Sequence, residues 1–135
     1  MRTDSNAAFE VAFEVRDYEC DLQGVVNNAV YLNYLEHARH QYLLSVGIDF
    51  AELHESGCDL VLTRLEIDFK DRLRSGDRLA ATVAVSRESR LRFAFDQQIL
   101  RLPERTPVIA ARAIGTGIID GRPGLPEALL SLLDG

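Results

Sequence analysis

Hydrophobic and polar residues alternate near the start of the chain. The apolar members of this pattern are Phe9, Val11, Phe13 and Val15, and mostly charged residues stand between them. A period of two is typical of a strand that buries one face. The pattern therefore predicts a half-buried strand over residues 9–16.

The period changes in the next patterned segment. Apolar residues there recur at Tyr31, Leu35, Ala38 and Tyr42, and polar residues take the opposite positions. Spacings of three and four place such residues on one face of a helix. We expect a helix of about four to five turns. It should end at Gly47, since glycine is the common C-terminal residue of helices.

A short second helix and four further strands are expected downstream. The short helix has Asp49 as a candidate N-cap and ends before Gly57. The strands follow alternating patterns over residues 61–70, 79–85, 91–99 and 108–119. Turns are expected at Ser75-Gly76-Asp77 and over 87–90, and one or two helical turns over 127–133.

The order of these elements indicates the fold class. One strand and two helices precede four strands at hairpin spacing, which favours an α+β fold with an antiparallel five-stranded sheet packed on one long helix. The chain has 135 residues and is 47% hydrophobic, enough for one domain with a proper core. We expect a single domain over residues 1–135.

Charge and composition narrow the functional classes. The net charge of −6 argues against nucleic acid as a partner. No apolar run approaches the roughly 20 residues of a membrane span, and no leader-like pattern follows Met1, so we expect a cytoplasmic protein without membrane contact. Fourteen of the fifteen basic residues are arginine. Arginine suits bidentate phosphate contacts, although a general arginine bias would give the same count.

Metal and thiol chemistry find little support in the sequence. Cys20 and Cys58 lack metal-ligand spacing, and we expect idle thiols. His37 and His40 are three residues apart on the polar helix face, without a third ligand nearby, and are expected to face solvent. We expect neither a metal nor a cofactor.

The most unusual junction lies between the first strand and the long helix. A carboxylate, Asp21, is followed three residues later by Gly24, and the helix begins soon after. The segment from Val15 to Arg39 resembles the hotdog-fold acyl-CoA thioesterases of the 4-hydroxybenzoyl-CoA thioesterase type. The positions that match the signature of this family are Cys20, Asp21, Gly24, Val25, Val26, Tyr31 and Glu36.

The resemblance implies a fold and a catalytic site. It implies a five-stranded antiparallel sheet wrapped around one long central helix, and hydrolysis of an aliphatic or aromatic acyl-CoA to free acid and CoA. Asp21 would act as nucleophile or general base, with Gly24 in the active-site turn. The backbone N–H of Asn28, at the positive end of the helix, would polarise the thioester carbonyl. A purely structural alternative is that Asp21 caps a turn and that Asn27 or Asn28 caps the helix.

Substrate contacts and assembly are also expected. Arg87, Arg90 and Arg92 surround a predicted hairpin and are candidates for binding the CoA phosphates, and Tyr31 is a candidate substrate contact. Solvated hairpin charges are the alternative. A sheet covered by one helix leaves edges and a face exposed, so we expect a homodimer or homotetramer, with sites between subunits as the family implies.

Two other functions stay open at this stage. A non-catalytic acyl-CoA-binding hotdog module is the first, but it would have no use for a carboxylate beside the thioester. A hotdog dehydratase or hydratase is the second and would need a histidine near the helix start. In several branches of the family a histidine or an aromatic residue stands in this loop, whereas this chain has Val25, Val26, Asn27 and Asn28. The sequence does not specify the acyl group.

Overall fold

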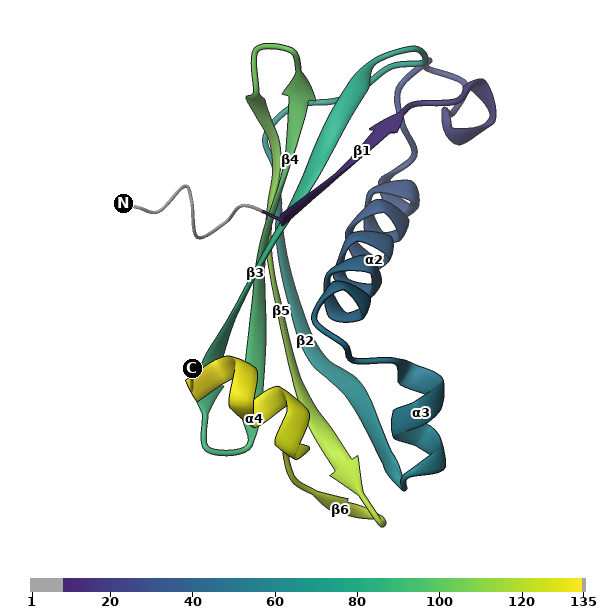
Figure 1. The fold of residues 1–135 in the computed structure, drawn as a ribbon. Helices are drawn as coiled ribbons and strands as arrows, with labels where there is room; N and C mark the ends of the chain where they lie inside the picture. Colours follow the sequence, from purple (N-terminus) through teal and green to yellow (C-terminus); the bar gives the residue numbers. More distant parts are fainter. Residues whose placement is uncertain (1–8, 135) are drawn as a thin grey trace.

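The computed structural model describes residues 9–134, and its fold is α+β (Figure 1). The helices are η1 (Asp17–Glu19), α2 (Asn28–Ser45), α3 (Phe50–Glu55) and α4 (Glu127–Asp134). The strands are β1 (Phe9–Glu14), β2 (Cys58–Phe69), β3 (Arg78–Ser89), β4 (Arg92–Leu102), β5 (Thr106–Ile119) and β6 (Arg122–Pro123). Residues 1–8 and 135 of the expected single domain lie outside the described residues.

One curled antiparallel sheet contains all of the strands. Its order is β1-β3-β4-β5-β2, with the two-residue strand β6 paired to β5. The five long strands confirm the predicted set, whereas β6 was not predicted, because Gly121 and Pro123 indicated only a break in the chain. Strand β2 begins at Cys58, three residues before the predicted start.

The long helix α2 lies against one face of the sheet (Figure 1). The core between them contains Tyr31, Tyr34, Leu35 and Ala38 from α2 together with Leu79, Ala81, Val83, Phe93, Phe95 and Ile99 from β3 and β4. Every second residue of β3 therefore contributes to the core, as the period of two predicted. The sequence pattern correctly identified both the helix and the sheet face that it covers.

The predicted glycine signal at the end of α2 is confirmed. Gly47 has a φ of 87°, a left-handed conformation that other residues adopt only with strain. Its N–H donates to the carbonyl of Leu44 at 3.1 Å, and the N–H of Ile48 donates to that of Leu43 at 2.8 Å. This pair of bonds is the Schellman arrangement, which satisfies carbonyls at a helix end.

The remaining helices are short. In α3, the side chain of Asp49 accepts hydrogen bonds from the N–H groups of Ala51 and Glu52, which confirms the predicted N-cap. Helix α4 follows β6 and contributes the fully buried Leu129 to the core. Within residues 9–134, no helix combines the length and the hydrophobicity needed to cross a membrane.

Candidate active site

The loop before α2 is a small hairpin that presents Asp21. The N–H of Asp21 donates to the carbonyl of Val25 at 2.9 Å, and that of Gly24 donates to the carbonyl of Asp21 at 3.0 Å. Cys20 and Val26 form an antiparallel bridge on either side. Gly24 closes the turn with a φ of 81°, a conformation that requires glycine or strain. Local backbone geometry therefore explains Gly24.

The same loop docks on the segment that precedes β3. The N–H of Val26 donates to the carbonyl of Leu73 at 2.8 Å, and Val25 forms a bridge with Arg74. The N–H of Leu73 in turn donates to the hydroxyl of Tyr31 at 3.0 Å. Segments 20–27 and 72–74 are thereby held together over the first turn of α2.

A second anchor holds the chain on the other side of the loop. The hydroxyl of Tyr34 donates to Glu19 at 2.7 Å, and the N–H of Arg16 donates to the same carboxylate at 2.9 Å. Burial raises the pKa of the Tyr34 phenol, and the hydrogen bond to Glu19 raises it further. Tyr34 therefore remains a neutral donor that fixes the chain immediately before Asp21.

The Asp21 carboxylate uses one oxygen for the turn. Its Oδ1 accepts a hydrogen bond from the N–H of Gln23 at 2.8 Å, as expected of a turn residue. Among residues 9–134, its Oδ2 has no hydrogen-bond partner, and the side chain is exposed. The structure is therefore compatible with both the capping role and a chemical role, since one oxygen orients the group and the other is available.

The start of α2 supplies a free donor beside this carboxylate. Asn27 is the N-cap, and its side chain accepts from the N–H of Ala29 at 3.0 Å. Among the described residues, no acceptor lies within hydrogen-bond distance of the N–H of Asn28, the first residue of the helix. Free N–H groups at this end of a helix carry partial positive charge and bind oxygen anions.

Asp21 and Asn28 line one depression of about 240 Å³. The other residues around it are Gln23, Val25, Val26, Asn27 and Arg72. An aspartate, the first residue of a helix and an arginine therefore line one space. Acyl transfer needs two parts: a base or nucleophile, and a hydrogen-bond donor for the oxyanion.

Arg72 is the residue of this depression that sequence reasoning missed. Its backbone N–H donates to Asp71 at 2.8 Å, and its carbonyl accepts from Arg101, so its main chain is pinned on both sides. Arg101 also pairs with Asp71 and holds the pKa of that carboxyl below its ordinary value. Within residues 9–134, the Arg72 guanidinium itself forms no ion pair. Only its position after the long strand could have suggested it.

Tyr31 lies in the core rather than on the wall of the depression. Only 1% of the residue is exposed, and its hydroxyl is occupied by Leu73. Burial raises the pKa of this phenol. In this chain Tyr31 therefore positions the 72–74 segment, and its expected contact with substrate stays a prediction.

The three hairpin arginines lie far from Asp21 within one chain. Arg87 pairs with Asp134 at 2.9 Å, and Arg90 and Arg92 are exposed at the Ser89 end of β3. The Asp21 loop meets the opposite end of β3, near Arg78. A strand of 12 residues separates the two ends by roughly 35–40 Å. A single chain does not bring these arginines to the depression.

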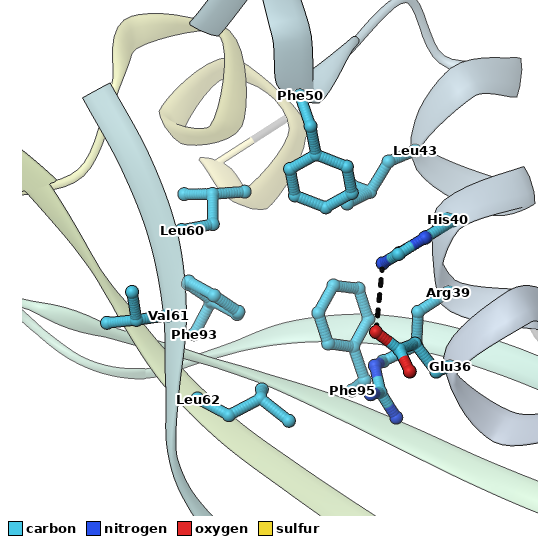
Figure 2. Close-up of a pocket in the computed structure, with 10 residues that line it drawn as sticks. All are labelled: Glu36, Arg39, His40, Leu43, Phe50, Leu60, Val61, Leu62, Phe93 and Phe95. Carbon is cyan, nitrogen blue, oxygen red and sulfur yellow. Dashed lines mark ion pairs between the residues drawn. The ribbon is translucent and has the colours of Figure 1, made fainter. Parts of the chain in front are cut away.

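A larger, mostly apolar cavity lies farther along α2, between α2, α3 and β2. Its volume is about 450 Å³. The apolar lining includes Leu43, Phe50, Leu60, Leu62, Phe93 and Phe95. Figure 2 shows these side chains around an open space, with Glu36, Arg39 and His40 on the α2 side.

Comparison with known proteins identifies the family of this chain. The model of the thioesterase-like superfamily matches residues 15–131, and the chain belongs to this family. The 4-hydroxybenzoyl-CoA thioesterase type is not resolved by this match.

Two plant proteins are similar in sequence. The acyl-acyl carrier protein thioesterases ATL3 and ATL2 of Arabidopsis thaliana, both named as chloroplastic, are 45% and 43% identical to this chain over 105 and 109 residues. These matches cover 78% and 81% of this chain but only 55% and 57% of the plant proteins. The chain thus spans little more than half the length of these relatives.

Solved structures share the fold. A 1,4-dihydroxy-2-naphthoyl-CoA thioesterase from Synechocystis superimposes with a TM-score of 0.85 at 22% identity, over 93% of this chain and 95% of its own. A protein from Aquifex aeolicus superimposes with a TM-score of 0.84 at 26% identity, over 93% and 98% of the two chains. The expected hotdog fold is therefore confirmed as an α+β fold with a curled antiparallel sheet, and the single long central helix stays a prediction.

Proposed function

We propose that this chain hydrolyses acyl thioesters, with Asp21 carrying the chemical step and the N–H of Asn28 binding the carbonyl oxygen. The observation that carries the proposal is that Asp21 and Asn28 line one depression, and that among residues 9–134 one carboxylate oxygen of Asp21 and the N–H of Asn28 have no hydrogen-bond partner. Membership of the thioesterase-like superfamily supports it. The turn at Gly24 gives the carboxylate its direction.

Two routes share these groups. In the first, the Asp21 carboxylate attacks the carbonyl carbon, the C–S bond breaks, the thiolate takes a proton from water, and water then hydrolyses the mixed anhydride. In the second, Asp21 takes a proton from a water molecule that attacks the carbonyl carbon directly, the C–S bond then breaks, and the departing thiolate takes up the proton from Asp21. In both, the negative charge that develops on the carbonyl oxygen is stabilised by the Asn28 N–H and the helix end. The proposed reaction uses protein groups and water alone.

The proposed thiol carrier is CoA, as the sequence resemblance implies. The plant relatives are named for acyl carrier protein, so a carrier-protein thioester is the second substrate to compare. The guanidinium of Arg72, which forms no ion pair within residues 9–134, suits an anionic or carbonyl group of either carrier. We further propose that the chain is of the 4-hydroxybenzoyl-CoA thioesterase type, with an aliphatic or aromatic acyl group.

We also propose a homodimer formed through β2. This strand is an edge of the sheet, and Val61, Leu62, Leu65 and Phe69 on it are exposed. Antiparallel pairing of two β2 strands would hide this edge and reverse the second copy. The hairpin from Arg87 to Arg92 would then lie at the same end of the dimer as Asp21 of the second copy. The expected contact of these arginines with CoA phosphates thus becomes possible between subunits, with α2 as the central helix of each copy.

Hydrolysis assays test the proposal directly. Purified protein is incubated with CoA and carrier-protein thioesters of graded acyl length, aromatic acyl groups included, and free thiol is measured. We expect turnover by the wild type and its loss in Asp21→Asn. Tight binding of acyl-CoA without turnover would instead identify a binding module.

A further inference from the structure

The cavity along α2 has one polar wall in otherwise apolar surroundings. Leucine and phenylalanine side chains from α2, α3, β2 and β4 form most of its lining, and Glu36, Arg39 and His40 form the α2 side (Figure 2). An apolar cavity of this size suits a hydrocarbon or aromatic group. The polar wall adds hydrogen-bonding groups to this apolar cavity.

Arg39 is a fixed, half-buried cation. Its Nη1 donates to Oε1 of Gln97 at 3.0 Å. Gln97 is buried, and its Nε2 donates to the carbonyls of Leu35 at 3.1 Å and Thr82 at 3.3 Å, which fixes the orientation of its amide. Burial lowers the pKa of the Arg39 guanidinium. Among residues 9–134, no carboxylate lies within 4.0 Å of it, so donors remain available to a ligand.

Glu36 places an acceptor on the same wall. It lies three residues before Arg39 on α2, and its charge partly offsets the effect of burial on the Arg39 pKa. Its Oε2 is 3.7 Å from Nε2 of His40, which is longer than a hydrogen bond. The wall therefore presents a donor and an acceptor side by side.

A hydroxyl is the group that uses both, because it donates one hydrogen bond and accepts others. A keto oxygen can accept from Arg39 but cannot donate to Glu36, and a carboxylate would meet the negative charge of Glu36. The mixed polarity of the wall thus favours a neutral hydroxyl on an otherwise apolar group.

The cavity lies in line with the candidate active site. Arg39 is eleven residues after Asn28, which amounts to about 16 Å of helix and just over three turns, so both lie on one face of α2. Exposed Leu32 lies between them along α2, and exposed Leu65 lies on β2 between Leu62 of the cavity and Phe69, whose ring centroid is 6.0 Å from that of Tyr31. An acyl group whose carbonyl is at Asn28 would run over these leucines into the cavity.

We propose that the cavity binds the far part of an acyl group that carries a hydroxyl, with Arg39 donating to the hydroxyl and Glu36 accepting from it. This inference rests on the proposed function, because it places the thioester carbonyl at Asn28. It identifies hydroxylated acyl thioesters as the preferred substrate class.

The test compares dodecanoyl-CoA with dodecanoyl-CoA hydroxylated at the ω carbon and at mid-chain. For at least one hydroxylated form we expect kcat/KM to exceed that of the plain thioester by about three- to tenfold, the range of one or two net hydrogen bonds. Arg39→Met and Glu36→Ala should each remove this preference while turnover of dodecanoyl-CoA changes by less than about twofold. Glu55→Ala, which removes an exposed acid on α3 outside the cavity, is the matched control and should keep the preference.

Calorimetric binding of the free acids separates this inference from the proposed function. Wild type should bind the hydroxylated dodecanoic acid more tightly than dodecanoic acid, and both variants should lose the difference, even if no thioester is hydrolysed. Because the Glu36 side chain is exposed, Glu36→Ala should fold normally. It therefore tests the inference even if Arg39→Met fails to fold. Equal binding and equal kcat/KM for all forms in the wild type, or a preference that survives in Glu36→Ala, would overturn the inference.

Discussion

At the scale of single residues, Asp21 combines a turn acceptor with a free carboxylate oxygen. Asp21→Asn keeps the oxygen that accepts from Gln23 but removes the charge and basicity. We therefore expect kcat for acyl-CoA hydrolysis to fall by at least about 10²-fold, with substrate binding retained. Steady-state kinetics together with binding of a non-hydrolysable thioether analogue measures the two effects.

Asp21→Ala distinguishes chemistry from capping. If the residue only caps the turn, alanine should lower the free energy of unfolding by roughly 0.5–2 kcal/mol and leave turnover per folded molecule nearly unchanged. Thermal unfolding and hydrolysis are measured on both variants. Wild-type turnover in folded Asp21→Asn protein would refute the catalytic role.

Gly24 offers a test of the turn itself. Among residues 9–134, no atom lies within 4 Å of an added Cβ, so space is not the constraint, but the φ of 81° is strained for alanine. We expect Gly24→Ala to cost about 1–2 kcal/mol and to lower kcat, since relaxation of the turn would redirect the Asp21 side chain. Gly76→Ala, with a φ of 88° and equally open surroundings, is the matched control. It should lose similar stability and keep its kcat, and equal activity losses in both variants would contradict the role of the Asp21 turn.

Individual residues were predictable to different degrees. Asp21, Gly24 and Asn28 follow one another within eight residues, so a local motif identified them before the fold was known. Arg72 reaches the same depression through tertiary packing of a loop that has no periodic pattern, which the sequence does not encode locally. Tyr31 shares the apolar helix face with Leu35, and that periodicity indicated burial more reliably than its place in the motif indicated a ligand contact.

At the scale of elements, α2 holds the loop that carries Arg72. Tyr31→Phe would remove the hydroxyl that accepts from the N–H of Leu73 and leave that buried group without a partner. We expect a loss of about 1–3 kcal/mol in the free energy of unfolding and faster hydrogen exchange at Leu73. Chemical denaturation and amide exchange measure these effects. Tyr42→Phe is the control, because the Tyr42 hydroxyl forms no hydrogen bond among residues 9–134. An equal loss of stability in this variant would argue against the specific bond between Tyr31 and Leu73.

Elements with a clear period were predicted well, and those without one were not. One buried face of β3 corresponds to the alternation from Leu79 to Val85. One buried face of α2 corresponds to the helical spacing from Tyr31 to Tyr42. Strand β2 begins earlier than predicted, because its first residues pair with the end of β5. The pair Arg122–Pro123 forms a strand only because β5 extends beside it.

At the scale of the whole molecule, β2 should control assembly. Leu65 is exposed on the edge strand, and Leu65→Arg would place a charge in the proposed interface. We expect the wild type to scatter light as a dimer at micromolar concentration and Leu65→Arg to shift towards a monomer with reduced activity. Ala12→Arg, an exposed substitution on the opposite edge strand β1, should remain a dimer. A fully active wild-type monomer would refute the proposed interface.

The proposed dimer would also determine the role of the hairpin arginines. Replacing Arg90 and Arg92 with alanine should raise KM for acyl-CoA several-fold and leave kcat nearly unchanged, because a phosphate contact is shared by ground and transition states. Free pantetheine thioesters lack the nucleotide phosphates and should show no change in KM. An unchanged KM for CoA thioesters would exclude the contact.

The two edges of the sheet differ in a way that bears on solubility. Strand β1 has six residues and carries the exposed acids Glu10 and Glu14, whereas β2 has twelve residues and exposes several large apolar side chains. Short, charged edges resist the addition of further strands. In the proposed dimer, pairing through β2 would therefore give a closed assembly, since the edge that remains, β1, is short and charged. Addition of further strands at β2 would then be confined to a chain that has not yet paired with a second copy.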